Sequence, residues 1–263
     1  MQLFFDFDGT LADSSPGIYA SFKHACTSQD LIAPDYFAFC AAIGPPVQVL
    51  ASSFFPQLGA SELEKLRKSF RQDYDHERFR LCQWYDGVEK TLLALSEIQG
   101  ARMAIITNKP TTPTVELLKV AGFSRYFELV VGIDYLLIQK TGPLFTKKAE
   151  AIHLAKSCLP SGGSTGFYIG DTPSDQSASL ACGLEFIAAT YGFHRWQKAE
   201  LEGINHVSRI KELIPLFKSS APKSITRISD SGGMESNPLH LMTPDLPAET
   251  AALAMRYLPE PAS

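Results

Sequence analysis

The sequence has few of the residues that mark disulfide-bonded, zinc-binding or redox proteins. Its 263 residues include only five cysteines, an odd number, and no two of them form a Cys-x-x-Cys pair. This usage is typical of reduced thiols in a cytosolic protein, so we expect a cytoplasmic location. The six histidines are dispersed, and none has a partner at the spacing of a metal site. We therefore interpret them as surface or packing residues.

Charge and hydropathy exclude further classes of protein. The net charge is only -4 and the basic residues are scattered, which argues against a nucleic-acid polymer or an anionic membrane as the main partner. No apolar run approaches the length of a membrane span, and no basic segment with a cleavage site opens the sequence, so we expect no signal peptide. The remaining composition is that of an ordinary globular protein. The chain is long enough for one large domain or a domain with an insertion. We expect a monomer or a homodimer.

Short apolar runs separated by amphipathic stretches predict an α/β fold. The runs are almost continuously apolar, as are strands buried on both faces of a parallel sheet. Several of the helical stretches end at glycine, which favours a doubly wound, mostly parallel, Rossmann-like sheet. The predicted strands are Leu3–Asp6, Met103–Thr107, Phe127–Val131, Phe167–Gly170 and Glu185–Ala189. The predicted helices between them are Lys90–Gln99, Pro113–Ala121, Thr146–Ser157 and Pro173–Ala181.

The interval between Asp13 and Asp86 interrupts this alternation. It has no convincing strand pattern and is too long for one crossover, so it predicts an inserted all-helical subdomain. The expected helices there are Ile18–Thr27, Tyr36–Ala42, Val47–Phe55 and Ser61–Cys82. Residues 219–263 begin with a stretch rich in Ser, Pro, Gly and Thr, which predicts a disordered tail with at most a short helix. The predicted division is a core of residues 1–13 and 87–218, an insertion of residues 14–86, and the tail.

Two aspartates, Asp6 and Asp8, stand at the end of the first predicted strand. Aspartates there can simply cap a turn, but an extended chain would place both carboxylates on one side, where like charges repel. A second acidic pair, Asp171 and Asp175, follows another predicted strand. The carboxyl ends of parallel strands form the edge at which such folds bind ligands. Oxygen ligands with no His or Cys nearby suit Mg²⁺.

A carboxylate at this edge can act as a nucleophile. It is ionised at neutral pH, so it needs no base to attack phosphorus. A phosphate dianion repels it unless Mg²⁺ and a lysine neutralise the charge, and the lysines available before the fourth strand are Lys140, Lys147 and Lys148. Thr107 supplies a hydroxyl at the end of a second strand. A second carboxyl can protonate the leaving oxygen and later deprotonate water.

These residues resemble the signatures of the haloacid dehalogenase-like superfamily, in its phosphatase branch. The matching segments are Asp6–Thr10 (DFDGT), Thr107 and Gly170–Asp175 (GDTPSD). Within the superfamily, the chain resembles the phosphoglycolate phosphatase-like group, in which a helical cap is inserted after the first motif. The segments that fit this group are Ile43–Pro46 (IGPP), Tyr85–Leu92 (YDGVEKTL), Thr107–Pro110 (TNKP) and Tyr191–Phe193 (YGF). The resemblance covers residues 1–218.

The resemblance implies a role for each acidic residue. Asp6 would be the nucleophile that forms an aspartyl-phosphate, and it would also contact the Mg²⁺ ion. Asp8 would be the general acid/base, with its backbone carbonyl on the metal. Asp171 would bind Mg²⁺ directly, and Asp175 would complete the metal site by orienting a bound water, or else orient the lysine.

The resemblance also implies a phosphate-binding set. Thr107 and the backbone N–H of Asn108 would hold the phosphoryl group together with a lysine. Lys148 is favoured as that lysine because it opens the K-x-E-x-I pattern of one branch, whereas Lys140 departs from the K-P-x-P form of another. Both alternatives stay open. The loop with Gly44 and Pro45 would either contact the substrate or be a plain turn between helices.

The function implied by this resemblance is that of a Mg²⁺-dependent phosphatase acting on a small phosphorylated metabolite. Phosphoglycolate, a nucleotide and a sugar phosphate all fit the motifs. One alternative is a phosphosugar mutase of the same fold, but the cap loop has no clear basic pair to hold a sugar phosphate in two orientations. Another is a non-catalytic phosphate-binding protein, against which the intact set of catalytic residues argues.

Overall fold

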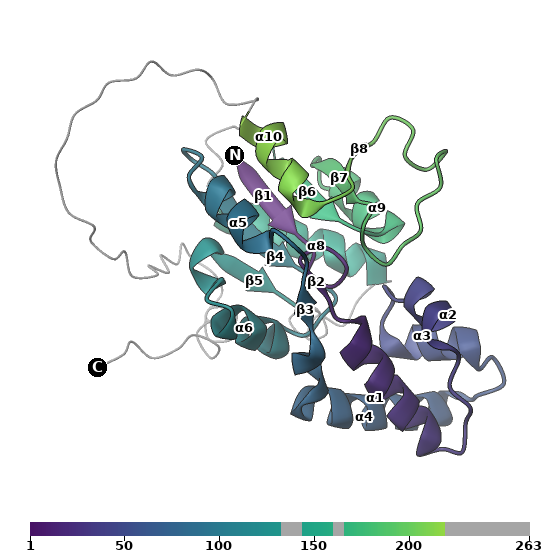
Figure 1. The fold of residues 1–263 in the computed structure, drawn as a ribbon. Helices are drawn as coiled ribbons and strands as arrows, with labels where there is room; N and C mark the ends of the chain where they lie inside the picture. Colours follow the sequence, from purple (N-terminus) through teal and green to yellow (C-terminus); the bar gives the residue numbers. More distant parts are fainter. Residues whose placement is uncertain (133–143, 160–165, 219–263) are drawn as a thin grey trace, which may run out of the picture. The chain divides into compact units, whose positions relative to one another are not determined.

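A computed structural model of the chain describes residues 1–132, 144–159 and 166–218, and these contain a six-stranded sheet (Figure 1). Every neighbouring pair of strands in the sheet is parallel. In spatial order the strands are β5 (Leu129–Val131), β4 (Arg102–Ile106), β1 (Gln2–Phe5), β6 (Gly166–Gly170), β7 (Glu185–Ala189) and β8 (Asn205–Val207). The predicted doubly wound parallel architecture is confirmed.

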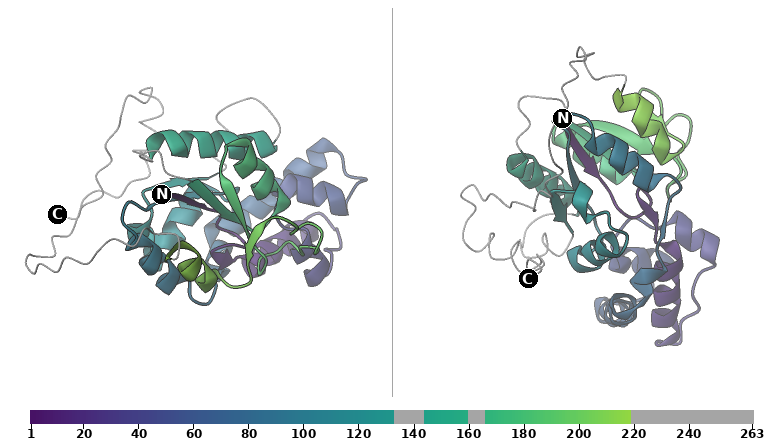
Figure 2. Two further views of the ribbon diagram at one scale, coloured as in Figure 1. Left: turned by 90° about the horizontal axis from the view of Figure 1, so that it is seen from above. Right: turned by 60° about the vertical axis from the view of Figure 1, so that its left-hand side comes forward.

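Helices cover both faces of this sheet (Figure 2). Alternate residues of β1 point to opposite faces, so Leu3 and Phe5 join one hydrophobic cluster and Phe4 joins the other. The helices on the Leu3 face are α5 (Val88–Ser96), α6 (Thr111–Val120) and α10 (Leu213–Lys218), and those on the Phe4 face are α8 (Leu144–Cys158) and α9 (Pro173–Ala181). Two short 3₁₀ turns, η2 (Ser124–Tyr126) and η3 (Ile210–Glu212), complete the connections. Burial of both faces explains why β1 has no polar face.

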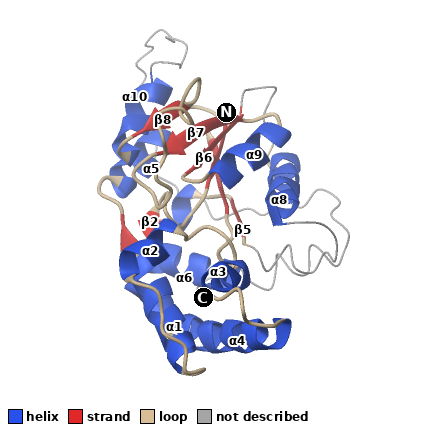
Figure 3. Ribbon diagram, turned by 90° about the vertical axis from the view of Figure 1, so that its right-hand side faces the viewer, coloured by secondary structure: helices blue, strands red, loops and turns tan. Residues whose placement is uncertain are grey.

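Helices fill the interval between β2 (Ala12–Asp13) and β3 (Gln83–Trp84), and we call this segment, residues 14–82, the helical insertion. Its elements are α1 (Ser15–Thr27), α2 (Tyr36–Ala41), α3 (Val47–Phe54), α4 (Ala60–His76) and the 3₁₀ turn η1 (Arg78–Leu81). Helices α1 and α4 lie side by side (Figure 3). The rings of Phe22, Phe39 and Phe54 pack together, which gives the insertion apolar contacts of its own.

Apart from shifts of up to three residues at the ends of elements, three features differ from the prediction. The helix predicted over Ser61–Cys82 ends at His76, because η1 packs against α1 at Gly17, where a side chain would overlap the Arg78 carbonyl. The strands β2 and β3 form a two-residue antiparallel pair in a stretch for which we predicted no strand, and they are too short to show a period. The sixth strand, β8, was also missed because only Val207 of its three residues is buried.

Further predictions concern disulfides, membrane spans, the C-terminal tail and the alternative lysine. The five cysteines form no disulfide. No helix in the described ranges combines the length and the apolar character needed to cross a membrane. The predicted tail, residues 219–263, and the alternative lysine, Lys140, lie outside the described residues.

Candidate active site

The ends of β1 and β6 bring two of the predicted carboxylates together. Phe5 pairs with Ile169 in the register of these strands, and the N–H of Asp6 donates to the carbonyl of Ile169 over 2.9 Å. Asp6 and Asp171 follow the two strands directly, so they leave the sheet at the same edge. Open α/β sheets bind their ligands at this edge.

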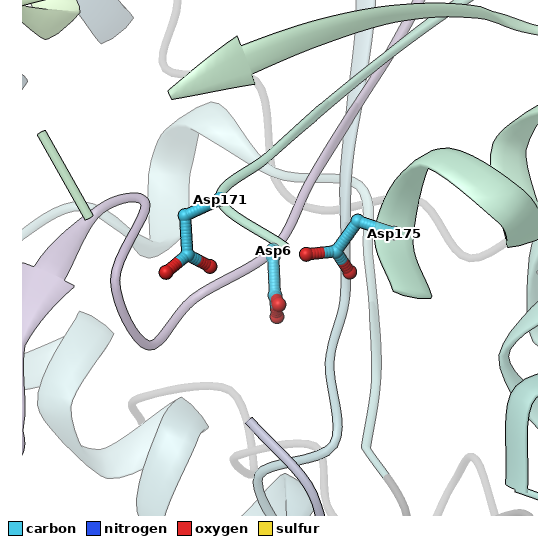
Figure 4. Close-up of side chains that lie close together, drawn as sticks. All are labelled: Asp6, Asp171 and Asp175. Carbon is cyan, nitrogen blue, oxygen red and sulfur yellow. The ribbon is translucent and has the colours of Figure 1, made fainter. Parts of the chain in front are cut away.

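The third carboxylate comes from the first turn of α9. Asp175 forms a capping box with Thr172, whose backbone N–H donates to Asp175 Oδ2 over 3.0 Å. One carboxylate oxygen from each of Asp6, Asp171 and Asp175 lies within 4.8 Å of the other two, and Figure 4 shows Asp6 between its two neighbours. All three residues are buried. We call them the carboxylate cluster.

A buried lysine offsets part of the charge of the carboxylate cluster. Lys148 lies in α8 with a side chain that is 2% exposed; its Nζ is 2.8 Å from Asp6 Oδ2 and also contacts Asp175. Burial by itself lowers the pKa of Lys148, but the carboxylates of Asp175 and Asp6 outweigh it and raise the pKa well above its ordinary value. Lys148 is therefore a fixed positive charge between two carboxylates.

The cluster contains more potential negative charge than Lys148 can neutralise. Burial raises the pKa of Asp6 to about 7, although the charge of Lys148 opposes this shift. Burial, together with the neighbouring carboxylates of Asp175 and Asp6, raises the pKa of Asp171 well above its ordinary value. A cation bound among these groups would favour their ionised forms.

The surroundings of Asp171 fit a magnesium ion. Its Oδ2 accepts the N–H of Phe193 over 2.8 Å, whereas its buried Oδ1 has no hydrogen-bond partner among the residues that the structure describes. The backbones of Gly9 and Gly192 approach this carboxylate so closely that a Cβ at either position would overlap Asp171. An all-oxygen donor set with a buried, unpartnered carboxylate oxygen matches the preferences of Mg²⁺.

Strand β4 brings the predicted phosphate-binding residues to the same edge. Thr107 directly follows β4; it is buried, its N–H donates to the Val131 carbonyl over 3.0 Å, and its side chain hydrogen-bonds to Asp6. Asn108 follows, and its Nδ2 donates to the carbonyl of Gly44 over 3.3 Å. The helical insertion therefore contacts the end of β4 through Gly44, whereas Pro45 is exposed.

Asp8 lies outside the carboxylate cluster and contacts a second buried lysine. Lys109 Nζ is 3.2 Å from Asp8 Oδ1 and also donates to the hydroxyl of Tyr74 in α4. The lysine side chain is 1% exposed and that of Asp8 is 20% exposed. Burial alone lowers the pKa of Lys109, but Asp8 and Tyr74 raise it above the ordinary value.

Comparison with known proteins shows the family to which this chain belongs. Residues 3–189 match the family model of the haloacid dehalogenase-like hydrolases. The chain belongs to this family. The phosphoglycolate phosphatase of Pectobacterium atrosepticum is 29% identical to this hydrolase over 224 residues, which cover 83% of the chain and 93% of the relative. The phosphoglycolate phosphatase of Yersinia pestis is 30% identical over 196 residues, covering 72% and 81%.

A solved structure agrees with this assignment. The crystal structure of a predicted phosphatase from Clostridium acetobutylicum superposes on the hydrolase with a TM-score of 0.69 at 25% identity, covering 83% of this chain and 98% of that one. The family and these relatives identify the chain as a phosphatase enzyme that is similar to phosphoglycolate phosphatases.

The structure places the predicted site residues of this hydrolase in two groups. One group lies together at the sheet edge: Asp6, Thr107, Lys148, Asp171 and Asp175. The other lies where the core meets the helical insertion: Asp8, Asn108 and Gly44. Sequence reasoning gave Lys109 no role, although its place directly after Thr107 and Asn108 at a strand end was a signal for one.

Proposed function

We propose that this hydrolase removes the phosphoryl group from a small phosphate monoester, with Mg²⁺, through an aspartyl-phosphate on Asp6. The observation that supports this most is the contact between Asp6 and Lys148 inside a buried cluster that also contains Asp171 and Asp175. A purely structural carboxylate gains nothing from two further carboxylates buried beside it, because like charges raise its free energy.

In the first step, a carboxylate oxygen of Asp6 attacks phosphorus while the bond from phosphorus to the ester oxygen breaks. Lys148, the hydroxyl of Thr107 and the N–H of Asn108 would bind the phosphoryl oxygens and stabilise their charge in the transition state. Asp8, protonated at this stage, gives its proton to the leaving oxygen. The products are the free alcohol, ionised Asp8 and phosphorylated Asp6.

In the second step, water replaces Asp6 on phosphorus. Ionised Asp8 removes a proton from the water molecule as its oxygen attacks the phosphorus atom. The bond between phosphorus and the Asp6 oxygen breaks, inorganic phosphate leaves, and Asp6 returns to a carboxylate. Asp8 is then protonated again and ready for the next substrate.

The residues proposed to hold Mg²⁺ are the carboxylates of Asp6 and Asp171 and the backbone carbonyl of Asp8, with Asp175 completing the site. Oδ1 of Asp171 is buried and has no hydrogen-bond partner among the described residues, which supports the place of Asp171 in this set. Bound Mg²⁺ would offset the negative charge of the phosphate dianion and of Asp6.

The helical insertion is proposed to act as a cap that closes over the phosphate site and selects the substrate. Its Gly44 carbonyl accepts a hydrogen bond from Asn108, and a Cβ at Gly44 would lie 3.5 Å from Thr172 Cγ2. The loop 43–46 thus lies near the ends of both β4 and β6. Phosphoglycolate is the first candidate substrate because of the names of the relatives, and nucleotide and sugar phosphates are the next.

The test is the release of inorganic phosphate from phosphoglycolate, nucleotides, sugar phosphates and p-nitrophenyl phosphate, with Mg²⁺ and with EDTA. We expect release that depends on Mg²⁺ and favours one compound. In Asp6→Asn, turnover should fall below detection while circular dichroism and thermal unfolding show a folded protein, because the amide cannot act as the nucleophile. Turnover that survives in Asp6→Asn would remove the aspartyl-phosphate from the proposal. Isomerised substrate without free phosphate would point to a mutase.

A further inference from the structure

Lys109 is a buried cation that the proposed reaction does not use. Its Nζ donates to Asp8 Oδ1 over 3.2 Å and to the Tyr74 hydroxyl. The same ammonium group lies 5.6 Å from the centre of the Phe7 ring and 4.8 Å from that of the Tyr74 ring. Two hydrogen bonds and two aromatic rings therefore fix the position of a side chain that is 1% exposed. A lysine so enclosed is not poised to bind substrate directly.

The backbone of Lys109 also makes a hydrogen bond at the proposed site. Its N–H donates to Thr107 Oγ1 over 3.2 Å, so the residue is tied to the proposed phosphate-binding hydroxyl. Its side chain reaches Asp8 in the loop after β1. One residue thus connects the end of β4 with the proposed acid/base at the end of β1.

Tyr74 connects the helical insertion to Lys109. It lies in α4, is 2% exposed, and stacks on Phe70 with ring centres 5.4 Å apart. It also packs beside Gly17 of α1, where a Cβ would lie 3.4 Å from Tyr74 Cε2. Because Tyr74 is held by both helices, a shift of the insertion relative to the core would move its hydroxyl relative to Lys109.

We propose that Lys109 is a positioning residue that orients Asp8 for proton transfer, and that Tyr74 links this orientation to the helical insertion. The inference rests on the proposed function, in which Asp8 is the general acid/base. The hydrogen bond from Lys109 occupies Oδ1 of Asp8, which leaves Oδ2 as the oxygen that gives and takes the proton. Without Lys109, the partly exposed carboxylate can rotate away from the reacting atoms.

The first experiment compares Lys109→Met with wild type, both with Mg²⁺, on two substrates. The p-nitrophenolate ion leaves without a proton, whereas the alkoxide of a preferred metabolite, such as phosphoglycolate, needs one. We expect kcat on the metabolite to fall about 10–100-fold with little change in KM, within the range that general acid–base catalysis contributes. On p-nitrophenyl phosphate, phosphorylation of Asp6 should stay fast and its hydrolysis should slow, so a rapid-mixing experiment should show a burst of about one p-nitrophenol per enzyme.

The matched control for the lysine is Lys156→Met. Lys156 is a partly buried lysine of α8 whose Nζ donates to the Cys182 carbonyl, away from the carboxylate cluster. This variant should show no burst beyond that of wild type. A fall in activity that is equal for both substrates, without a burst, would show that Lys109 serves only the structure. A rise in KM with kcat unchanged would show that Lys109 binds substrate, and either result would overturn the proposal.

The second experiment tests the link to the helical insertion and stays informative if Lys109→Met unfolds. Tyr74→Phe removes one hydroxyl and keeps the ring, and it should slow hydrolysis of the phosphorylated enzyme severalfold. The double variant Lys109→Met/Tyr74→Phe should be no slower than Lys109→Met alone, because Tyr74 acts through Lys109. Tyr19→Phe is the control, since the Tyr19 hydroxyl donates to the Pro34 carbonyl within the insertion. Two results would show that Tyr74 does not link the helical insertion to Asp8. One is that the effects of Lys109→Met and Tyr74→Phe on this hydrolysis add in the double variant. The other is that Tyr74→Phe and Tyr19→Phe slow it equally.

The outcomes also separate this inference from the proposed function. If Asp6→Asn retains turnover, the proposed function fails and the inference fails with it. If Asp6→Asn is inactive and wild type forms a trapped aspartyl-phosphate, the proposed function stands. In that case the behaviour of Lys109→Met and Tyr74→Phe decides the inference alone.

Discussion

Asp6 sits in surroundings that differ greatly from water. It is 7% exposed and lies beside the carboxylates of Asp171 and Asp175, with Lys148 as its ion-pair partner. Burial penalises its ionised form more than Lys148 favours it, so its pKa rises from 3.8 to about 7. The folded chain without a metal therefore keeps a proton on Asp6 at pH values where the unfolded chain releases it.

This difference predicts how the stability of the metal-free protein depends on pH. Between the unfolded pKa of 3.8 and the folded pKa of about 7, the folded state binds more protons, so the free energy of unfolding decreases as pH rises. The loss amounts to about 1.4 kcal/mol for each pH unit in this window. Asp6→Asn removes the titrating group, so in EDTA it should be more stable than wild type at about pH 8 and nearly equal at about pH 4.

Urea unfolding of wild type and Asp6→Asn in EDTA, at a series of pH values, measures this difference. A difference that does not change with pH would contradict the raised pKa of Asp6. Addition of Mg²⁺ at about pH 8 should stabilise wild type, because an ion that binds only the folded state shifts the equilibrium toward it. The gain should be smaller in Asp6→Asn, which lacks one proposed carboxylate ligand.

At the scale of elements, helix α9 holds Asp175 through its own N-terminal cap. Thr172 Oγ1 donates to Asp175 Oδ2 over 2.7 Å and accepts the Asp175 N–H over 3.3 Å. The first turn of α9 thereby fixes the carboxylate that contacts Lys148. The same hydrogen bonds that begin the helix thus orient a residue of the carboxylate cluster.

Thr172→Ala should reveal both effects of this cap. We expect a loss of about 1 kcal/mol in the free energy of unfolding, as for other N-cap substitutions, together with a higher Mg²⁺ concentration for half-maximal activity. Asp35→Ala is the matched control, because Asp35 caps α2 by accepting the N–H groups of Phe37 and Ala38. It should lose similar stability, as measured by urea unfolding, and leave the Mg²⁺ dependence unchanged. An unchanged Mg²⁺ dependence in Thr172→Ala would separate the cap from the metal site.

Whether an element can be predicted from the sequence depends on its burial and its length. Strands β1, β4, β6 and β7 are largely buried, so each is a nearly continuous apolar run that can be recognised without a structure. The pair β2–β3 has two residues in each strand, which is too few for any periodic signal. The end of α4 at His76 depends on packing against α1, which a local pattern does not contain.

Three residues of the site could be predicted because the strands before them could be predicted. Asp6, Thr107 and Asp171 each follow a buried strand directly, so predicting the strands also predicted that these residues share an edge. The contact of Lys148 with Asp6 joins residues 142 positions apart, and from the residues alone Lys148 was one of three candidates. The role of Lys109 depends on Tyr74, a residue of the insertion, and no local motif indicates that contact.

At the scale of the whole described core, the helical insertion meets the sheet at a small number of polar contacts. The pair β2–β3 joins its two ends, Lys109 contacts Tyr74, Asn108 contacts Gly44, and Arg80 of η1 forms an ion pair with Glu116 of α6. Two of these contacts involve the consecutive residues Asn108 and Lys109, which follow Thr107 after β4. A change in the position of the insertion would therefore move two residues that directly follow Thr107 of the proposed phosphate site.

Gly44→Ala tests the contact between the helical insertion and Asn108. Gly44 has φ +146°, in a region that disfavours side chains, so alanine should strain the loop by about 1–2 kcal/mol and displace the carbonyl that Asn108 contacts. We expect kcat/KM for the preferred substrate to fall about tenfold, mainly through a higher KM, because the loop would select substrate and take no part in bond breaking.

Gly183→Ala provides the control for strain alone. Gly183 has φ +66°, and no described residue beyond its chain neighbours has an atom within 4 Å of the place that a Cβ would take there. It precedes β7, at the edge of the sheet opposite the site. It should lose similar stability in urea unfolding, because alanine is strained at either position. Its steady-state kinetics should match those of wild type. If both variants change KM alike, strain alone explains the effect; if neither does, the insertion does not select substrate through Gly44.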